Sequence, residues 1–223
     1  MELIYNGVDH ARFHPGPYAR MQARKRLGID GDDKTVVLYC PSRFESKKGV
    51  FYLLFATREL VERGFPIILL LGQPSLPDDI AKIAGSLGIR PRIILNPQPF
   101  KNQPESYWAA DISVLPSLDE SFGLPVIESM AAGVPVCASA VGAITELIQD
   151  KVSGLLVPSK DPMSLASAIE TVINNDRLRR ALHVGEERRA AQFSSEYMVA
   201  SYRRMFSRVV EERHVARDGR CNN

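Results

Sequence analysis

The stretch TVVLYCPSRFESKKGV, from Thr35 to Val50, contains the pattern that decides the fold of this chain. Its first part, the strand expected at Thr35–Cys40, contains the unbroken apolar run VVLYC rather than an alternation of apolar and polar residues. Such a run is typical of a parallel strand that is covered on both faces. Gly49 then lets the chain turn into a helical pattern that begins at Val50. The stretch therefore predicts a buried strand, a loop and a helix in succession, which is the repeating unit of an α/β protein.

The same alternation continues along the chain. Further strands are expected at Pro66–Leu71, Arg92–Leu95, Asp111–Leu115, Val134–Ala138 and Gly154–Val157. Helices are expected at Val50–Arg63, Asp78–Leu87, Glu105–Ala110, Val126–Ala132 and Ile144–Gln149. Gly64, Gly88 and Gly133 follow three of these helices, at the position where a left-handed residue commonly ends a helix. The predicted fold class is α/β, a Rossmann-like, doubly wound parallel sheet of about six strands with additional C-terminal helices.

The two ends of the chain differ from this core. The N-terminal region is irregular and turn-rich, with a short helical piece at Tyr18–Leu27. The region after the last strand contains two or three successive helical patterns. The expected parts are an irregular segment with a short helix (1–33), a strand–helix core (34–160), C-terminal helices of the same domain (161–215) and a frayed tail (216–223).

The composition bears on the class of protein and its surroundings. The chain has 223 residues, and its 28 basic and 26 acidic residues give a net charge of +2. This balance gives no case for a nucleic-acid partner. Cys40, Cys137 and Cys221 lack metal-ligand spacing, and an odd cysteine count fits reduced thiols better than a disulfide framework. No apolar run is long enough to span a bilayer. A cytoplasmic protein without a metal site is therefore expected.

The loop after the first strand is rich in positive charge. In an open α/β sheet, ligands bind outside the carboxyl ends of the strands, near the switch in strand order. This loop brings Arg43, Lys47 and Lys48 close together in sequence. A guanidinium fork with a nearby ammonium group suits a diphosphate. A solvated basic loop is an equally good interpretation of the spacing alone.

The loop after the fourth strand, PSLDESFGLP, leads into the helix expected at Val126–Ala132. With Pro125 at the first helical position, the amides around Phe122, Gly123 and Leu124 would point into open space at the positive end of the helix dipole. The arrangement predicts a phosphate-binding site, and the glycine allows a close approach of the backbone. The Phe122 ring is expected to pack under the loop.

Two glutamates lie on either side of this helix N-terminus. Glu120 precedes Glu128 by eight positions. Neither is expected to bind phosphate, because like charges repel. An ionised carboxylate is an acceptor and pairs well with two vicinal hydroxyls. The pair therefore predicts a ligand that carries a ribose on one side of a diphosphate and a sugar on the other. Each glutamate taken alone is also explained as a surface charge.

These motifs together resemble a known family. The arrangement Glu120-Ser-Phe-Gly-Leu-Pro-x-x-Glu128, followed by AAGVPV and GLLVP, resembles the donor-binding half of retaining GT-B glycosyltransferases of family 4 (group 1). NGVDHARFHP looks like the linker between the two domains of such enzymes, and YWAADISVLPS and AVGAITELIQDKVSGLLV also match. The resemblance covers nearly residues 4 to 210. It implies transfer of a glycosyl group with retention from a UDP- or GDP-sugar, without an obligatory metal or another cofactor.

The resemblance also implies roles for particular residues. Catalytic roles are expected for Glu120, which contacts hydroxyls of the transferred sugar, and for Arg43 and Lys48, which hold the diphosphate. The expected donor-binding residues are Glu128 for the ribose, Ser121, Phe122, Gly123 and Leu124 for the diphosphate, and Pro99 and Phe100 for the base. Ser42 stands where the family usually has glycine. This and other departures leave the preference for base and sugar open.

The resemblance implies a partner as well. A full enzyme of this family has two Rossmann-like domains, and this chain starts at the linker between them. The expected partner is an N-terminal acceptor-binding domain, missing or on a separate chain, without which this chain is expected to be inactive. The alternative is a noncatalytic nucleotide-sugar-binding or interaction module.

The C-terminal region from Arg177 to Arg220 carries eleven arginines and no lysine. An apolar stripe runs along its last helix, through Val199, Tyr202, Phe206 and Val209. Packing of this stripe on the sheet or on the missing domain is the simpler interpretation. The alternative is a peripheral contact with the inner face of a membrane, where enzymes of this family often work on lipid-linked acceptors.

Overall fold

The computed structural model describes residues 2–29, 34–97 and 103–218, and one six-stranded sheet lies at the centre of the part described. Its strands are β1 (Val36–Cys40), β2 (Ile67–Leu71), β3 (Ile93–Leu95), β4 (Ile112–Leu115), β5 (Val136–Ser139) and β6 (Leu155–Val157). Neighbouring strands are all parallel, in the order β3-β2-β1-β4-β5-β6. This order confirms the predicted doubly wound, Rossmann-like sheet.

The unbroken apolar runs are explained by burial on both faces of the sheet. Successive side chains of a strand point to opposite faces. In β1, Leu38 and Cys40 belong to one hydrophobic cluster, whereas Val37 and Tyr39 belong to another. A strand with a cluster on each side has no position at which a polar side chain would face water, so apolar residues continue without alternation.

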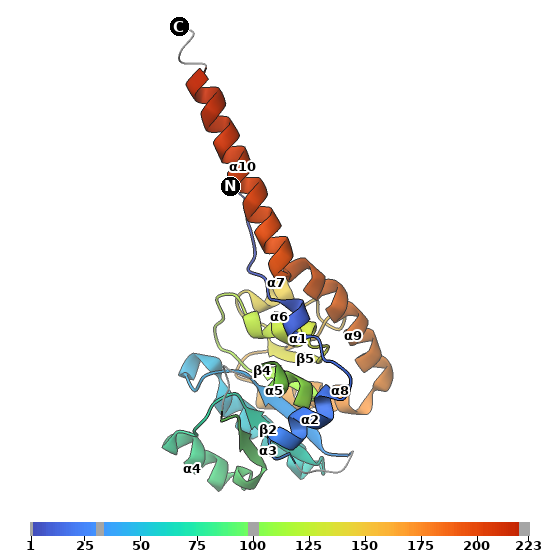
Figure 1. Ribbon diagram of the computed structural model, residues 1–223. Helices are drawn as coiled ribbons and strands as arrows, with labels where there is room; N and C mark the ends of the chain where they lie inside the picture. The colour runs from blue at the N-terminus through green and yellow to red at the C-terminus, as the bar shows by residue number, and fades with distance from the viewer. Residues whose placement is uncertain (1, 30–33, 98–102, 219–223) are drawn as a thin grey trace.

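Helices cover the two faces of this sheet (Figure 1). They are α1 (His10–Phe13), α2 (Ala19–Arg26), α3 (Val50–Glu62), α4 (Asp78–Ser86), α5 (Gln103–Ala109), α6 (Leu124–Ala131), α7 (Ile144–Leu147), α8 (Pro162–Asn174), α9 (Asp176–Ala190) and α10 (Ser195–Asp218). Short 3-10 turns, η1 (Ser46–Lys48), η2 (Arg90–Arg92) and η3 (Ala191–Phe193), complete the set. Apolar residues of α3, α4 and α8 share the cluster of Leu38, and those of α1, α2 and α5 share the cluster of Tyr39.

The ends of the helices agree in part with the ends predicted from the sequence. Gly64, Gly88 and Gly133 have φ angles of 88°, 69° and 68°, which confirms their predicted left-handed conformation. The helix expected at Val126 begins at Leu124 instead, and Pro125 therefore takes the second helical position rather than the first. The earlier start is permitted because Gly123, with φ 93°, turns the chain directly before the helix.

The two ends of the chain also show differences from expectation. A short helix, α1, precedes the predicted N-terminal one, and the Asp9 carboxylate caps it by accepting from the Arg12 amide. At the other end, α10 continues to Asp218, past the boundary at 215 where the tail was expected to begin. None of the helices described combines the length and the hydropathy needed to cross a membrane.

The N-terminal segment packs against the C-terminal helices. The Val8 amide donates to Phe193 O at 2.9 Å, and the Ser195 amide donates to Val8 O at 2.9 Å. Figure 1 shows α10 projecting beyond the layers of the domain, and Arg208 on this helix pairs with Glu2 of the N-terminal segment. Residues from opposite ends of the chain thus meet where α10 begins and again at Arg208.

Candidate functional site

The strand order places a topological switch between β1 and β4. Strand β1 pairs with β2 on one side and with β4 on the other, so the chain leaves these neighbouring strands in opposite directions. The two loops that were predicted to bind the ligand follow β1 and β4, and both therefore start at this switch. A crevice at the carboxyl ends of the strands is the usual ligand position in such a sheet.

These two loops contact one another directly. The Leu118 amide donates to Lys47 O at 2.7 Å. Gly49, with φ 64°, lies so close to the β4 loop that a Cβ atom here would be 1.9 Å from Pro116 O. Only glycine adopts this left-handed backbone readily and also has no side chain that would clash with Pro116 O. Gly49 therefore allows the basic loop to lie against the acidic one.

The contact between the loops brings Lys48 and Glu120 together. The Lys48 ammonium lies 2.6 Å from Glu120 Oε2, with side-chain exposures of 17% and 11%. The Ala143 amide donates to Glu120 O at 3.2 Å, and Gly142 lies against this carbonyl. The sequence assigned these two side chains to different parts of a ligand. Their pairing means that a group that approaches the ammonium also approaches the carboxylate.

Glu128 occupies a buried position on α6. It is 9% exposed, so the interpretation as a surface charge is wrong. Tyr107 Oη and Gln103 Nε2, both on α5, donate to the same oxygen, Glu128 Oε2, at 2.7 Å each. Burial raises the pKa of Glu128, and the two hydrogen bonds act in the opposite direction because they stabilise the charged form.

The start of α6 has the features of an anion site. No hydrogen bond within the described part of the chain is donated by the amides of Phe122, Gly123 or Leu124. These amides lie at the positive end of the helix dipole. The Phe122 ring packs on the apolar cluster beneath the loop, with its centroid 6.1 Å from that of Tyr5, as the sequence predicted. Ser121 is exposed beside it.

A cavity of about 350 Å³ borders the basic loop, the start of α6 and Glu128, but Glu120, Ser121, Phe122 and Gly123 are not among the residues that line it. Four of its lining residues were predicted site residues: Arg43, Lys48, Leu124 and Glu128. The Arg43 side chain is exposed, with Nε 3.1 Å from Glu45 Oε1. Lys47 is not among the lining residues, and its ammonium lies 3.4 Å from the same carboxylate. Pro99 and Phe100 lie outside the described residues.

Sequence reasoning missed part of this cavity. Tyr39, Gly72, Gln73 and Gln103 line it, and Tyr107 contacts Glu128 from behind. One signal was available, because Gln103 and Tyr107 are four positions apart and a helix brings such residues to one face. The sequence does not show which carboxylate this face of α5 contacts.

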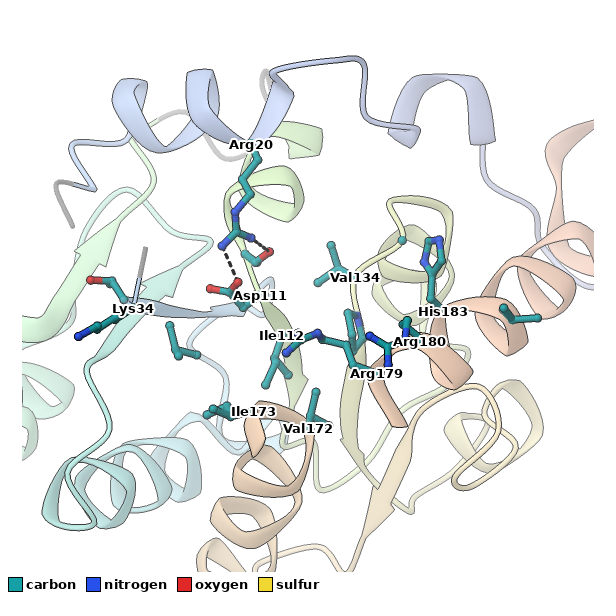
Figure 2. A pocket seen from close by; sticks show the side chains of 16 residues that line it. Arg20, Lys34, Asp111, Ile112, Val134, Val172, Ile173, Arg179, Arg180 and His183 are labelled. Carbon is teal, nitrogen blue, oxygen red and sulfur yellow. Dashed lines mark hydrogen bonds and ion pairs between the residues drawn. The ribbon is translucent and has the colours of Figure 1, made fainter. Parts of the chain in front are cut away.

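A second cavity, of about 810 Å³, lies at the opposite edge of the sheet. Figure 2 shows Arg20, Arg179, Arg180 and His183 around it. Part of its lining lies at or directly before the starts of β1, β4 and β5, so it opens at the amino ends of the strands, and the rest comes mainly from α8 and α9.

The charges around this second cavity are largely engaged within the protein. Arg20 bonds to Asp111 Oδ1 at 2.6 Å, and Arg179 bonds to Asp176 Oδ1 at 2.5 Å. Asp111 Oδ2 accepts from Arg24 at 2.7 Å and from the Val37 amide at 2.8 Å. The Asp111 network fastens α2 to the sheet, which is a structural task. We therefore place the candidate site at the carboxyl edge, although its cavity is smaller.

The described residues at the two edges do not form a cluster of metal-ligand side chains. No group of three or more His, Cys, Asp or Glu side chains is placed there to hold a metal ion. The positive groups beside the carboxyl-edge cavity are Arg43, Lys48 and the α6 amides. The arrangement is suited to bind an anion together with groups that donate hydrogen bonds to Glu128.

Comparisons with known proteins show the family of this chain. The family described as "Glycosyl transferases group 1" matches residues 20–188. A D-inositol 3-phosphate glycosyltransferase of Geodermatophilus obscurus is 36% identical over 221 residues, which are 94% of this chain and 48% of that protein. The chain spans about half the length of the curated relatives that it matches.

Solved structures show the same fold. Anabaena Alr3699/HepE, in complex with UDP and glucose, has a TM-score of 0.81 at 22% identity, over 92% of this chain and 56% of that one. The C-terminal domain of a group 1 family protein (LpcC) from Francisella tularensis has a TM-score of 0.71 at 23% identity, over 83% of this chain and 97% of that one.

Proposed function

Because this chain belongs to the group 1 glycosyltransferase family, we propose that it is the donor-binding domain of a retaining enzyme that uses a UDP- or GDP-sugar. Group 1 glycosyltransferases use nucleotide-sugar donors. The single observation that carries the proposal is the shared cavity at the β1–β4 switch, which gathers Arg43, Lys48, Leu124 and Glu128 from separate loops and helices. A structural neighbour solved with UDP and glucose lends support.

In this proposal the donor lies across the start of α6. Arg43, Lys48 and the amides of Phe122 and Gly123 bind the diphosphate, with Ser121 and Leu124 beside it. Glu128 accepts hydrogen bonds from the ribose hydroxyls, and Glu120 accepts them from the transferred sugar. The base lies toward the loop that contains Pro99 and Phe100.

The chemical task of this domain is to stabilise the departing diphosphate. When the bond from the anomeric carbon to the diphosphate breaks, negative charge grows on the leaving oxygen. We propose that Lys48, Arg43 and the α6 dipole offset that charge, and that Lys48 exchanges its contact with Glu120 for one with the diphosphate. These cationic groups take the electrostatic part that a metal ion plays in other transferases, and we propose that no metal is required.

The acceptor is proposed to bind a second, N-terminal domain; the curated relatives are about twice the length of this chain, which leaves room for one. Transfer would then need both domains, and this chain alone is expected to be inactive. A noncatalytic binding module remains the alternative. Joining this chain to an acceptor-binding domain distinguishes the two, because only an enzyme half would then support transfer.

The apolar stripe of α10 is proposed to pack on that second domain. Tyr202 is 40% exposed and Phe206 is 61% exposed, so packing of the stripe on the sheet is excluded. Their stacked rings, 6.3 Å apart, instead form an uncovered surface flanked by arginines. Peripheral contact with a membrane is the alternative use of this surface, and binding to anionic vesicles that Phe206→Ser abolishes would favour it.

Calorimetry with Glu128→Ala tests the donor site. We expect UDP or GDP to bind the wild-type chain with EDTA present, and Glu128→Ala to bind roughly tenfold or more weakly, because hydrogen bonds to a charged group contribute about 1.5–3 kcal/mol. Glu170→Ala, on α8 and paired with Arg63, is the control and should bind normally. Equal affinity of Glu128→Ala and wild type would contradict the ribose assignment.

A further inference from the structure

Tyr107 is a buried phenol that the proposed donor site does not use directly. It is fully buried on α5, and its hydroxyl donates to Glu128 Oε2 at 2.7 Å. Its ring is held edge-to-face by two others, with centroids 4.8 Å from Tyr39 and 5.7 Å from Phe13. The ring therefore has no room to turn, and the position of the hydroxyl is set by packing.

The hydroxyl of Tyr107 acts on one oxygen of the carboxylate only. Gln103 Nε2 donates to that same Oε2 atom, also at 2.7 Å. Within the described residues, no hydrogen bond reaches Glu128 Oε1. Two donors on one oxygen hold the carboxylate in a single orientation and leave the other oxygen for a ligand. Glu128 itself borders the cavity.

The two donors also favour the charged carboxylate. Burial raises the pKa of Tyr107 well above its usual value, so the phenol keeps its proton and can donate. Burial also raises the pKa of Glu128, and the hydrogen bonds from Tyr107 and Gln103 counteract this rise. The positive charge of Arg12, on α1, lowers the Glu128 pKa further, and Lys48 lines the same cavity.

We propose that Tyr107 is a positioning residue for nucleotide binding, which orients Glu128 so that Oε1 accepts hydrogen bonds from the ribose hydroxyls. The inference rests on the proposed function, because it takes the ligand to be a ribonucleotide. Tyr107 does not line the cavity, and it is too deeply buried to touch a ligand. Its hydroxyl also lies 3.3 Å from Pro125 O, which borders the cavity, so the effect that identifies action through Glu128 is a change in the preference for ribose rather than in affinity alone.

The test compares a ribonucleotide with its 2′-deoxy analogue on Tyr107→Phe. This substitution removes one oxygen and keeps the packed ring. We expect wild type to bind UDP or GDP more tightly than the 2′-deoxy form. Tyr107→Phe should lose roughly tenfold in affinity for the ribonucleotide and less for the analogue, because the analogue lacks the 2′-hydroxyl and so cannot offer Glu128 the vicinal pair.

A neighbouring residue gives the matched control. Trp108 follows Tyr107 on α5, and its indole nitrogen donates to Phe13 O at 2.6 Å. Trp108→Phe removes a hydrogen bond of the same helix without touching Glu128, so it should keep the wild-type preference for ribose. If Tyr107→Phe does not fold, judged by thermal unfolding, Gln103→Leu removes the other donor to Oε2 and should also reduce the preference.

The pH dependence of binding gives a second readout. Glu128 must be charged to accept from both hydroxyls, so affinity should fall as the pH drops through its pKa. Loss of the Tyr107 hydrogen bond raises that pKa further, and the fall should occur at higher pH in Tyr107→Phe than in wild type.

The outcomes separate the two proposals. If wild type binds no nucleoside diphosphate, the proposed function fails, and the role of Tyr107 fails with it. If wild type binds and prefers ribose but Tyr107→Phe shows the same preference and the same pH profile, only the positioning role is overturned. Equal loss of affinity for both nucleotides would also overturn it, since that result indicates a general structural effect.

Discussion

At the scale of single residues, the Lys48–Glu120 pair changes how the site is understood. The sequence indicated a cation for the diphosphate and a carboxylate for the sugar. In the structure their charged atoms are 2.6 Å apart and mostly covered. Each therefore compensates the other while no ligand is bound, and a donor that binds between or beside them must provide comparable contacts.

A double-mutant cycle measures this pairing. Lys48→Met leaves the Glu120 carboxylate without its partner, so we expect a loss of about 1–3 kcal/mol in the free energy of unfolding. Adding Glu120→Gln should recover part of that loss, because the uncompensated charge is then gone. Urea unfolding without nucleotide gives the four values. Additive effects of the two substitutions would show that the pair does not contribute to stability.

Glu186 gives a prediction about pH that is independent of the donor site. It is fully buried on α9, where Oε1 accepts from the Val136 amide at 3.3 Å and Oε2 has no hydrogen-bond partner among the described residues. Burial raises the Glu186 pKa from 4.5 to about 8. The folded protein therefore keeps a proton here that the unfolded chain releases.

The stabilising effect of that proton is complete below pH 4.5 and is lost as the pH rises toward 8. Across this window the free energy of unfolding should fall by about 1.4 kcal/mol per pH unit from this group alone. Glu186→Gln removes the dependence, so the variant should exceed wild type in stability most clearly above pH 8. Unfolding curves measured from pH 5 to 9 check this. A parallel pH dependence of the two proteins would contradict it.

The sequence could indicate candidate site residues where a residue would act from its own loop. Arg43, Lys48 and the start of α6 lie in the two loops that follow β1 and β4, and strand ends can be found in the sequence. Tyr107 could not be found this way. Its role depends on a hydrogen bond to Glu128 on another helix, and such a pairing becomes visible only when α5 and α6 are placed in space.

At the scale of elements, Gly49 controls how the basic loop meets the acidic one. A Cβ atom at this position would lie 1.9 Å from Pro116 O. Gly28 has nearly the same backbone, with φ 65° against 64°, but a Cβ atom there meets nothing within 4 Å. Alanine substitutions at the two glycines therefore distinguish two losses of stability, the one from a left-handed backbone and the one from forcing the loops apart.

Alanine substitutions at Gly28 and Gly49 test whether the contact between the two loops shapes the site. Gly28→Ala should cost about 1–2 kcal/mol, the usual penalty for a left-handed side-chain-bearing residue. Gly49→Ala should cost clearly more in urea unfolding, and it should also weaken nucleotide binding, because the Lys48 loop must move. If both variants lose the same stability and bind nucleotide alike, the contact between the loops does not shape the site.

Strands and helices with a strong hydrophobic pattern were predicted well from the sequence. Mostly apolar runs, several of them unbroken, indicated the six strands, because burial on both faces of the sheet favours apolar residues. The four-residue helix α1 was missed, since one turn is too short to show helical periodicity. The start of α6 was placed two residues late, because Pro125 is compatible with either of the first helical positions.

At the scale of the whole molecule, the strand order decides where ligands bind. The number of strands follows from the sequence, but the order β3-β2-β1-β4-β5-β6 depends on which strands pair across the sheet. Once that order is known, the loops after β1 and β4 become neighbours, and their separate motifs form one cavity. The larger cavity at the other edge has no loop that leaves a strand at its carboxyl end.

An NMR titration with UDP and GDP tests the central claim most directly, because it asks at which edge the nucleotide binds. Amide signals of Phe122, Gly123 and Leu124 should shift as nucleotide is added, and Gly133 and Val134, at the amino edge, should not. This pattern would support a donor site at the start of α6. Shifts confined to Gly133 and Val134, or no shift at either edge at millimolar nucleotide, would contradict it.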